Sequence, residues 1–202
     1  MYREYLKTMT ISKITLIGFE QASIIHDLAH MINAQGMVAE ILHPDEFFKN
    51  NFESGSHFMV TVTRELVLRK AIVDKLDNDN LLRYTFVHPL AYIDPTATIG
   101  EGTFIAPFCA VAYNATVGKD CTMGPYSMIS HKSHIGNGSL IHSGAMVAGS
   151  TTIGQYCLLN LRCSVIDKLD ICDEVSVGAG SLVTKSIDNP GHYVGSPARR
   201  VV

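Results

Sequence analysis

The sequence predicts a small parallel α/β layer followed by a coil of short parallel strands, and three observations support this fold class. A period of six residues runs through the C-terminal half of the chain, over 87–188. Strand-like and helix-like runs alternate over 13–84, where that period is absent. The apolar content of 47% is that of an ordinary globular protein with a sizeable core.

Residues 1–12 are expected to form a loose extension before the α/β layer. Strand-like runs follow at 14–18, 37–42 and 58–63, and helix-like runs at 23–34 and 65–76. The first helix-like run carries an apolar stripe at helical spacing, which is typical of a helix that packs on a sheet. The order βαββα predicts an α/β domain over 13–84, with a hinge at 77–80.

Seventeen consecutive hexads fill 87–188, and each begins with Val, Ile, Leu or Met. The residue four places after each lead is small in nearly every hexad. A period of six fits neither a helix nor an alternating strand, so each hexad is interpreted as a short strand plus a turn. Three hexads then close one triangular coil, with the leads inside and residues eighteen apart stacked. Residues 189–202 are expected to form a C-terminal tail.

Charge and composition exclude several classes of protein. The 16 basic and 19 acidic residues give a net charge of −3 without a basic stripe, which argues against a nucleic-acid partner. The N-terminus lacks the apolar stretch of a signal peptide, and no apolar run approaches the length of a spanning helix. A cytoplasmic protein that does not bind membranes is therefore expected.

The cysteines and histidines do not predict a metal site. Four of the five cysteines occupy the small position of a hexad, where Cys behaves as a small buried hydrophobe. His131, His134 and His142 crowd into twelve residues, whereas β-helical zinc enzymes recruit histidines from widely separated coils. No metal is expected.

Four segments carry a resemblance to a known family: 14–18, 64–72, 88–100 and 193–200. They resemble the hexapeptide-repeat sugar acyltransferases that include sialic acid O-acetyltransferases and bacillosamine-pathway nucleotide-sugar N-acetyltransferases. The resemblance covers nearly the whole chain. It implies a Rossmann-like α/β domain followed by a left-handed parallel β-helix.

The resemblance implies that His131 is the catalytic general base, since it aligns with the family's catalytic histidine. A neutral imidazole suits proton removal from an amine or hydroxyl that attacks a thioester. The alternative is a surface histidine that stacks on neighbouring coils. Lys132 stands where relatives carry an acidic residue, so the group that orients His131 is left open. His134 and His142 are candidates for substrate contacts or for the subunit interface.

The resemblance also implies binding of acetyl-CoA or another acyl-CoA along a groove between adjacent β-helices. The matching positions are Gly149, Leu161 and Ala179. Basic residues near the C-terminal end, Lys185, Arg199 and Arg200, either meet the phosphates or form a solvated cluster.

The expected substrate contacts in the α/β domain are Gly18 and Phe19. Relatives carry a glycine-rich turn after the first strand, where backbone N–H groups approach a nucleotide diphosphate. Here only Gly18 remains, and an acidic pair after the second strand is replaced by His43-Pro44-Asp45. Binding of a uridine nucleotide does not carry over directly.

The resemblance implies acyl transfer from acyl-CoA to an amino group of a nucleotide-linked sugar, by direct attack on the thioester. Alternatives left open are O-acetylation of a sialic-acid-like sugar or polysaccharide, acyl transfer to a small amino acid, and a non-catalytic β-helical scaffold. No long loop interrupts the hexads, so flat faces are expected to pack three copies into a homotrimer.

Overall fold

A computed structural model describes residues 11–19, 23–53 and 55–201. The chain divides into two compact units between Tyr84 and Thr85. Apart from Ile11 and Ser12, the predicted extension over 1–12 lies outside the described residues. No helix in the described ranges is long and apolar enough to cross a membrane.

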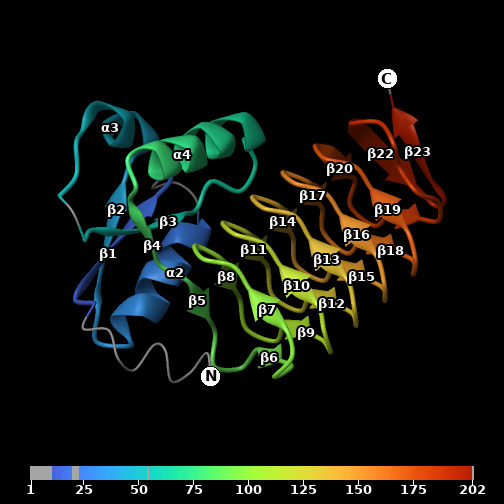
Figure 1. Cartoon of the computed structure of the whole chain (residues 1–202), viewed down its shortest axis with the longest axis horizontal. Coiled ribbons are helices and arrows are strands. Elements are labelled where there is room, and N and C mark those ends of the chain that lie inside the picture. The colour runs from blue at the N-terminus through green and yellow to red at the C-terminus, as the bar shows by residue number, and fades with distance from the viewer. Residues whose placement is uncertain (1–10, 20–22, 54, 202) are drawn as a thin grey trace. The chain divides into compact units, whose positions relative to one another are not determined.

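The N-terminal unit is built on a four-stranded parallel sheet with strand order β2-β1-β3-β4 (Figure 1). Along the chain its elements are β1 (Lys13–Ile17), α2 (Ser23–Asn33), β2 (Val38–Leu42), α3 (Pro44–Lys49), β3 (His57–Val60), α4 (Leu66–Asn78) and β4 (Leu82–Arg83). Strands alternate with helices and every strand pair is parallel, so the predicted Rossmann-like layer is confirmed.

Two details of this unit differ from the expected βαββα order. The short helix α3 and the short strand β4 are additional elements. Pro44 opens α3, and the His43 side chain accepts a hydrogen bond from the Asp45 N–H at 3.2 Å. These are ordinary helix-start signals, but six residues are too few for a periodic apolar pattern. The expected hinge at 77–80 instead forms the end of α4 and the turn before β4.

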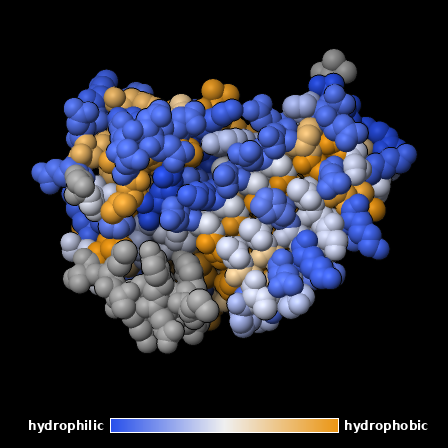
Figure 2. All heavy atoms as spheres, in the orientation of Figure 1, coloured by the Kyte–Doolittle hydropathy of each residue, from blue (hydrophilic) through white to orange (hydrophobic). Residues whose placement is uncertain are grey.

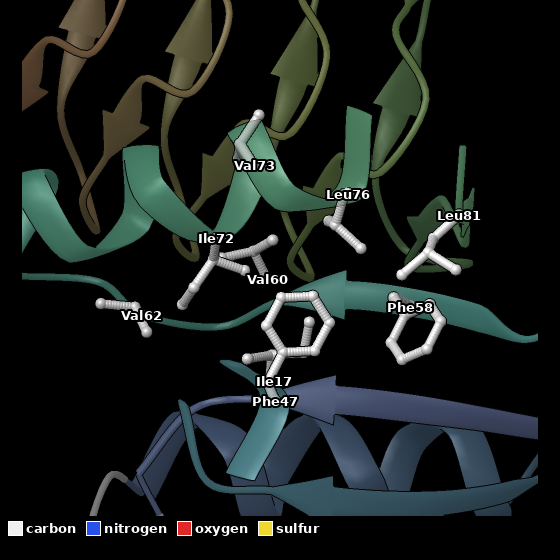
Figure 3. Close-up of a cluster of buried hydrophobic side chains, with 9 residues drawn as sticks. All are labelled: Ile17, Phe47, Phe58, Val60, Val62, Ile72, Val73, Leu76 and Leu81. Carbon is white, nitrogen blue, oxygen red and sulfur yellow. The ribbon is translucent and has the colours of Figure 1, made fainter. Parts of the chain in front are cut away.

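The core of this unit joins β1 and β3 to α3 and α4 (Figure 3). Its buried members are Ile17, Phe47, Phe58, Val60, Val62, Ile72, Val73, Leu76 and Leu81. Arg69 of α4 is also fully buried, and its guanidinium donates to the carbonyls of Val60 at 3.2 Å and Val62 at 2.8 Å. The buried charge is thus hydrogen-bonded to the end of β3 and the residues just after it, as burial of a polar group requires.

The C-terminal unit is a parallel β-helix whose strands form three sheets along successive coils (Figure 1). The five-stranded sheet holds β7 (Thr98–Ile99), β10 (Thr116–Val117), β13 (His134–Ile135), β16 (Thr152–Ile153) and β19 (Asp170–Ile171). The six-stranded sheet holds β6 (Tyr92–Ile93), β9 (Ala110–Val111), β12 (Met128–Ile129), β15 (Met146–Val147), β18 (Ser164–Val165) and β21 (Leu182–Val183). The eight-stranded sheet holds β5 (Phe86–Val87), β8 (Phe104–Ile105), β11 (Thr122–Met123), β14 (Leu140–Ile141), β17 (Leu158–Leu159), β20 (Val175–Val177), β22 (Gly191–Gly195) and β23 (Ala198–Val201). The predicted parallel β-helix is confirmed.

The hexad register explains the packing of this unit. Residues eighteen apart pair in parallel, as in Thr116 with His134 and His134 with Thr152. The lead residues from Ile105 to Val183 are all buried, while those of the first three hexads are partly buried. The repeat therefore supplies one continuous interior that each coil shares with its neighbours.

Small residues at the corners add buried polar rungs to this interior. The Ser139 hydroxyl donates to the Gly154 carbonyl at 2.9 Å and accepts from the Cys157 N–H at 3.0 Å. The Ser133 hydroxyl makes the same pair of bonds with Ala148 at 2.7 Å and Thr151 at 3.2 Å. Such hydroxyls satisfy backbone groups that the turns leave without partners.

The predicted C-terminal tail forms a hairpin. Strand β22 pairs in parallel with β20, and β23 pairs antiparallel with β22. The hairpin therefore continues the eight-stranded sheet beyond the last complete coil. In the view of Figure 2, weakly polar, pale-coloured side chains cover much of the coil surface, with single hydrophobic residues among them.

Candidate active site

His131 lies in the turn that leads from β12 of the six-stranded sheet to β13 of the five-stranded sheet, and its side chain is exposed. Backbone bonds hold this turn between its neighbours. The Lys132 N–H donates to the Tyr113 carbonyl at 2.9 Å, and the Ser150 N–H donates to the His131 carbonyl at 2.8 Å. His131 is therefore a surface residue on a rigid part of the coil.

The imidazole of His131 lies against Gly149, the equivalent residue of the next coil. A Cβ placed on Gly149 would stand 2.5 Å from Nε2 and 2.9 Å from Nδ1 of that ring. Any other residue at 149 would require this exposed ring to move, so glycine permits the close approach seen here. Gly149 and His131, predicted separately from the sequence as donor-binding and catalytic residues, are thus brought together.

Ser130 is a site residue that the sequence did not single out. Its Oγ lies 3.2 Å from Nδ1 of His131, within hydrogen-bond distance. Ser130 stacks between Ala112 and Ala148, the residues eighteen positions before and after it. Among these three equivalent positions, the hydroxyl occurs in the coil that carries His131. That coincidence is the signal that could have identified it.

Lys132, which replaces the acidic residue of relatives, occupies a left-handed backbone conformation with φ 58°. The fourth residue of nearly every hexad shares this conformation, including Asn114 and Ser150. The position is therefore a regular corner of the coil, and the Lys132 side chain is exposed there.

The other two candidate histidines lie on other parts of the coil. His134 is exposed on β13, in the five-stranded sheet, between Thr116 and Thr152. His142 follows β14, in a turn that leads from the eight-stranded to the six-stranded sheet, and is partly buried. The three histidines that crowd together in the sequence are thus spread over two turns and one sheet. In the described ranges, no group of three or more His, Cys, Asp or Glu side chains is arranged to hold a metal ion.

The three residues predicted to bind the acyl donor fall into two places. Leu161 and Ala179 stack in the turns from the eight-stranded to the six-stranded sheet, where the Gly180 N–H donates to the Leu161 carbonyl at 2.9 Å. Both are exposed. Gly149 lies in the turn from the six-stranded to the five-stranded sheet. Gly149 therefore lies at the carboxyl end of the strands of the six-stranded sheet, and Leu161 and Ala179 lie at their amino end.

The basic residues of the C-terminal end are partly engaged within the hairpin. The Arg200 guanidinium donates to the Pro190 carbonyl at 2.9 Å, and Arg199 donates to the Ala198 carbonyl at 3.0 Å. Lys185 is exposed in the segment between β21 and β22.

In the N-terminal unit, Gly18 and Phe19 stand at the carboxyl end of β1. The Gly18 N–H donates to the Leu42 carbonyl at 3.0 Å, and a Cβ on Gly18 would collide with the Thr61 hydroxyl. That hydroxyl donates to the Ile17 carbonyl at 2.9 Å. Phe19 packs edge-on against His43, with ring centroids 5.3 Å apart. At this end of the sheet, Gly18 therefore lies against the Thr61 side chain and Phe19 against His43.

The repeats of the β-helix match a known family model, the bacterial transferase hexapeptide (six repeats), over residues 96–131 and 114–149. Residues 96–149 carry bacterial transferase hexapeptide repeats. The matched segment of this hexapeptide-repeat unit includes both His131 and Gly149. No curated protein sequence matches the chain.

Solved structures share the fold of the hexapeptide-repeat chain over almost its full length. The acetyltransferase domain of PglB from Neisseria gonorrhoeae has a TM-score of 0.83 at 18% identity, covering 94% of this chain and 99% of that one. The same domain in complex with acetyl coenzyme A has a TM-score of 0.82 at 18% identity, covering 95% and 100%. A variant of perosamine N-acetyltransferase from Caulobacter crescentus, in complex with CoA and GDP-perosamine, has a TM-score of 0.82 at 17% identity, covering 96% and 99%. At these identities the likeness establishes the fold.

Proposed function

We propose that this protein transfers an acyl group, acetyl in the first instance, from acyl-CoA to an amino group of a nucleotide-linked sugar. The observation that carries the proposal is the pairing of His131 with Gly149: an exposed imidazole whose Nε2 lies beside a glycine at a predicted donor-binding position. The shared fold supports it, because the similar structures include a sugar N-acetyltransferase with CoA and GDP-perosamine bound.

In the proposed reaction His131 acts as general base. The amino nitrogen of the sugar attacks the thioester carbonyl, and Nε2 of His131 removes the proton that the nitrogen gives up. A backbone N–H beside the groove stabilises the tetrahedral oxyanion. Collapse forms the amide, breaks the carbon–sulfur bond and releases the CoA thiolate, which takes the proton back from the imidazolium. No covalent enzyme intermediate is required.

The acyl donor is proposed to lie between two copies of the chain. Gly149 is at the carboxyl end of the strands of the six-stranded sheet, and Leu161 and Ala179 are at their amino end. In a cyclic trimer the contacts are heterologous, so the surface at one end of these strands faces the surface at the other end in the neighbouring copy. A groove between copies would then bring Gly149 of one chain close to Leu161 and Ala179 of the next.

The distribution of exposed hydrophobic side chains supports this homotrimer. Within residues 85–201, all of which the structure describes, the large exposed hydrophobics other than Val201 of β23 lie on the six-stranded sheet and in the turns that flank it. They are Leu90, Tyr92, Phe108, Tyr113, Tyr126, Met128, Met146, Leu161 and Ile166. Exposed apolar side chains gathered on one face mark a protein interface.

We place the acceptor on two sets of residues. The nucleotide part is assigned to Gly18 and Phe19, at the carboxyl edge of the parallel sheet, where open α/β sheets bind ligands. His134 and His142 are assigned to contacts with the acceptor or with a neighbouring copy. Because the glycine-rich turn is missing, the aromatic pair of Phe19 and His43 is expected to contact the base or the sugar.

The deciding experiment is thiol release from acetyl-CoA against a panel of nucleotide-linked amino sugars, unlinked amino sugars and sugars that offer only hydroxyl groups. Turnover is expected only with a nucleotide-linked amino sugar, and His131→Ala is expected to lower kcat at least about 100-fold, the usual contribution of a general base. His30→Ala, which removes an exposed histidine from α2, is the matched control. Turnover only on hydroxyl acceptors, or full activity of His131→Ala, would overturn the proposal.

A further inference from the structure

The environment of the two ring nitrogens of His131 differs. Nδ1 lies 3.2 Å from the Ser130 hydroxyl. The edge of the ring formed by Cε1 and the two nitrogens lies against Gly149, where a Cβ would overlap Cε1 and stand 2.5 Å from Nε2 and 2.9 Å from Nδ1. Both nitrogens therefore border the position assigned to the acyl donor, but Nδ1 alone also lies within hydrogen-bond distance of the Ser130 hydroxyl.

Ser130 is held in place by the coil itself. Its N–H donates to the Val147 carbonyl at 2.9 Å, which fixes the backbone of the residue next to His131. Ala112 and Ala148 occupy the equivalent positions in the two adjacent coils, so the column needs no hydroxyl for packing. The Ser130 hydroxyl is thus a polar group that the repeat does not require.

We propose that Ser130 is the positioning residue of His131: its Oγ accepts a hydrogen bond from Nδ1–H and so holds the imidazole in the tautomer whose Nε2 lone pair is free. This inference rests on the proposed function, in which Nε2 takes the proton of the attacking amine. It answers what replaces the acidic residue of relatives at the position of Lys132. The acceptor is a neutral hydroxyl one residue before the histidine instead of a carboxylate one residue after it.

The direction of the hydrogen bond is decisive for the chemistry. A neutral imidazole has one N–H and one lone pair. If Ser130 accepted from Nδ1–H, Nε2 would be the base. If Ser130 donated to Nδ1 instead, Nε2 would carry the hydrogen and could not receive a proton. After proton transfer both nitrogens carry hydrogen, and the bond from Nδ1–H to Oγ becomes charge-assisted and stronger, which favours the transfer.

The first test is the tautomer of His131 in the free protein, read from the 15N chemical shifts of its ring nitrogens at a pH where the imidazole is neutral. His131→Ala identifies the resonances. The wild type is expected to be predominantly the Nδ1–H tautomer, and Ser130→Ala is expected to lose that preference. A wild-type ring in the Nε2–H form, or the same tautomer in Ser130→Ala, would overturn the proposal.

The second test is kinetic. Ser130→Ala copies the alanines of the adjacent coils, so the coil is expected to fold unchanged, and kcat is expected to fall about 2- to 12-fold, as for one net hydrogen bond, with KM unchanged. Ser130→Thr, which keeps the hydroxyl, should retain wild-type kcat, and Ser164→Ala is the matched control. A rise in KM with an unchanged kcat would argue against a positioning role. Because the spectra need no substrate, absence of turnover on every acceptor would refute the proposed function and leave the tautomer result intact.

Discussion

The His131 ring lies against Gly149 of the next coil, where a Cβ would overlap Cε1 of the ring. A histidine on the coil surface is thereby fixed on one side by a residue that is eighteen positions away in the sequence. The contact couples the orientation of the proposed base to the identity of the residue at 149.

Gly149→Ala is predicted to displace the imidazole at little cost in stability, below about 1 kcal/mol, because the added methyl group meets only the end of an exposed side chain that can rotate away. Its kcat is expected to fall by at least about tenfold, because a misplaced catalytic group loses alignment with its substrate. In a His131→Ala background the added methyl group meets no ring. The effect of Gly149→Ala on kcat should therefore largely disappear in that background, which turnover by the four proteins in a double-mutant cycle measures. Equal losses in both backgrounds would show that the two residues are not coupled.

Met128→Lys combined with Met146→Lys is predicted to dissociate the proposed homotrimer. Both methionines are exposed on the six-stranded sheet, which carries the apolar side chains of the coil surface. Two lysines placed at the interface would bury unpaired charge, which is strongly destabilising. Light scattering after size exclusion should change from three copies to one. Thr152→Lys, an exposed change on the five-stranded sheet, is the control. Dissociation by the control alone would show that the interface lies on the five-stranded sheet and not on the six-stranded one.

The coil could be predicted because it follows from the length of the repeat. A lead residue every six positions can fill one interior only if three hexads make a turn, and the pairing of Thr116 with His134 follows from that count. The same count separates Gly149 from Leu161 by two hexads and joins Leu161 to Ala179 by three. The spacing thus already predicts that Gly149 lies in a different turn of the coil from Leu161 and Ala179.

Other features depend on side-chain geometry that no period records. The contact between Ser130 and His131 requires one choice of rotamer at adjacent residues. The helix α3 depends on capping by His43 instead of on an apolar stripe. The Thr61 hydroxyl lies against Gly18 because β1 and β3 are neighbours in the sheet, and the sequence leaves that strand order open.

Alkylation by iodoacetamide at pH 8 is predicted to modify Cys172 before any other cysteine. Cys172 is partly exposed, whereas Cys109, Cys121, Cys157 and Cys163 are buried. Burial raises the pKa of Cys157 and of Cys163 to about 12, so these thiols stay protonated and unreactive. Mass spectrometry of the native protein should find one modified site, and five after unfolding in urea. Rapid modification of Cys157 or Cys163 in the native protein would contradict their burial.

The same pKa values predict how stability depends on alkaline pH. The unfolded chain ionises Cys157 and Cys163 near the ordinary value of 9.0, while the folded chain holds their protons until the pH reaches about 12. The unfolded state therefore binds fewer protons in this interval, and the free energy of unfolding falls as pH rises from about 9 towards 12. Replacing both residues by alanine should flatten this slope, which urea titrations at several pH values would measure. An unchanged slope would assign the loss of stability to other groups.

Ser139→Ala is predicted to destabilise the β-helix by about 1–3 kcal/mol, the usual effect of leaving buried partners unsatisfied. The fully buried Ser139 hydroxyl donates to the Gly154 carbonyl and accepts from the Cys157 N–H, so its removal leaves both groups without that partner. Alanine itself fits the corner, because Ala145 occupies the same position of the next hexad. Ser143→Ala, in a partly exposed turn, should change the free energy of unfolding by less than about 0.5 kcal/mol. Equal effects of the two substitutions on urea unfolding would mean that the corner hydroxyls fill space without stabilising the coil through hydrogen bonds.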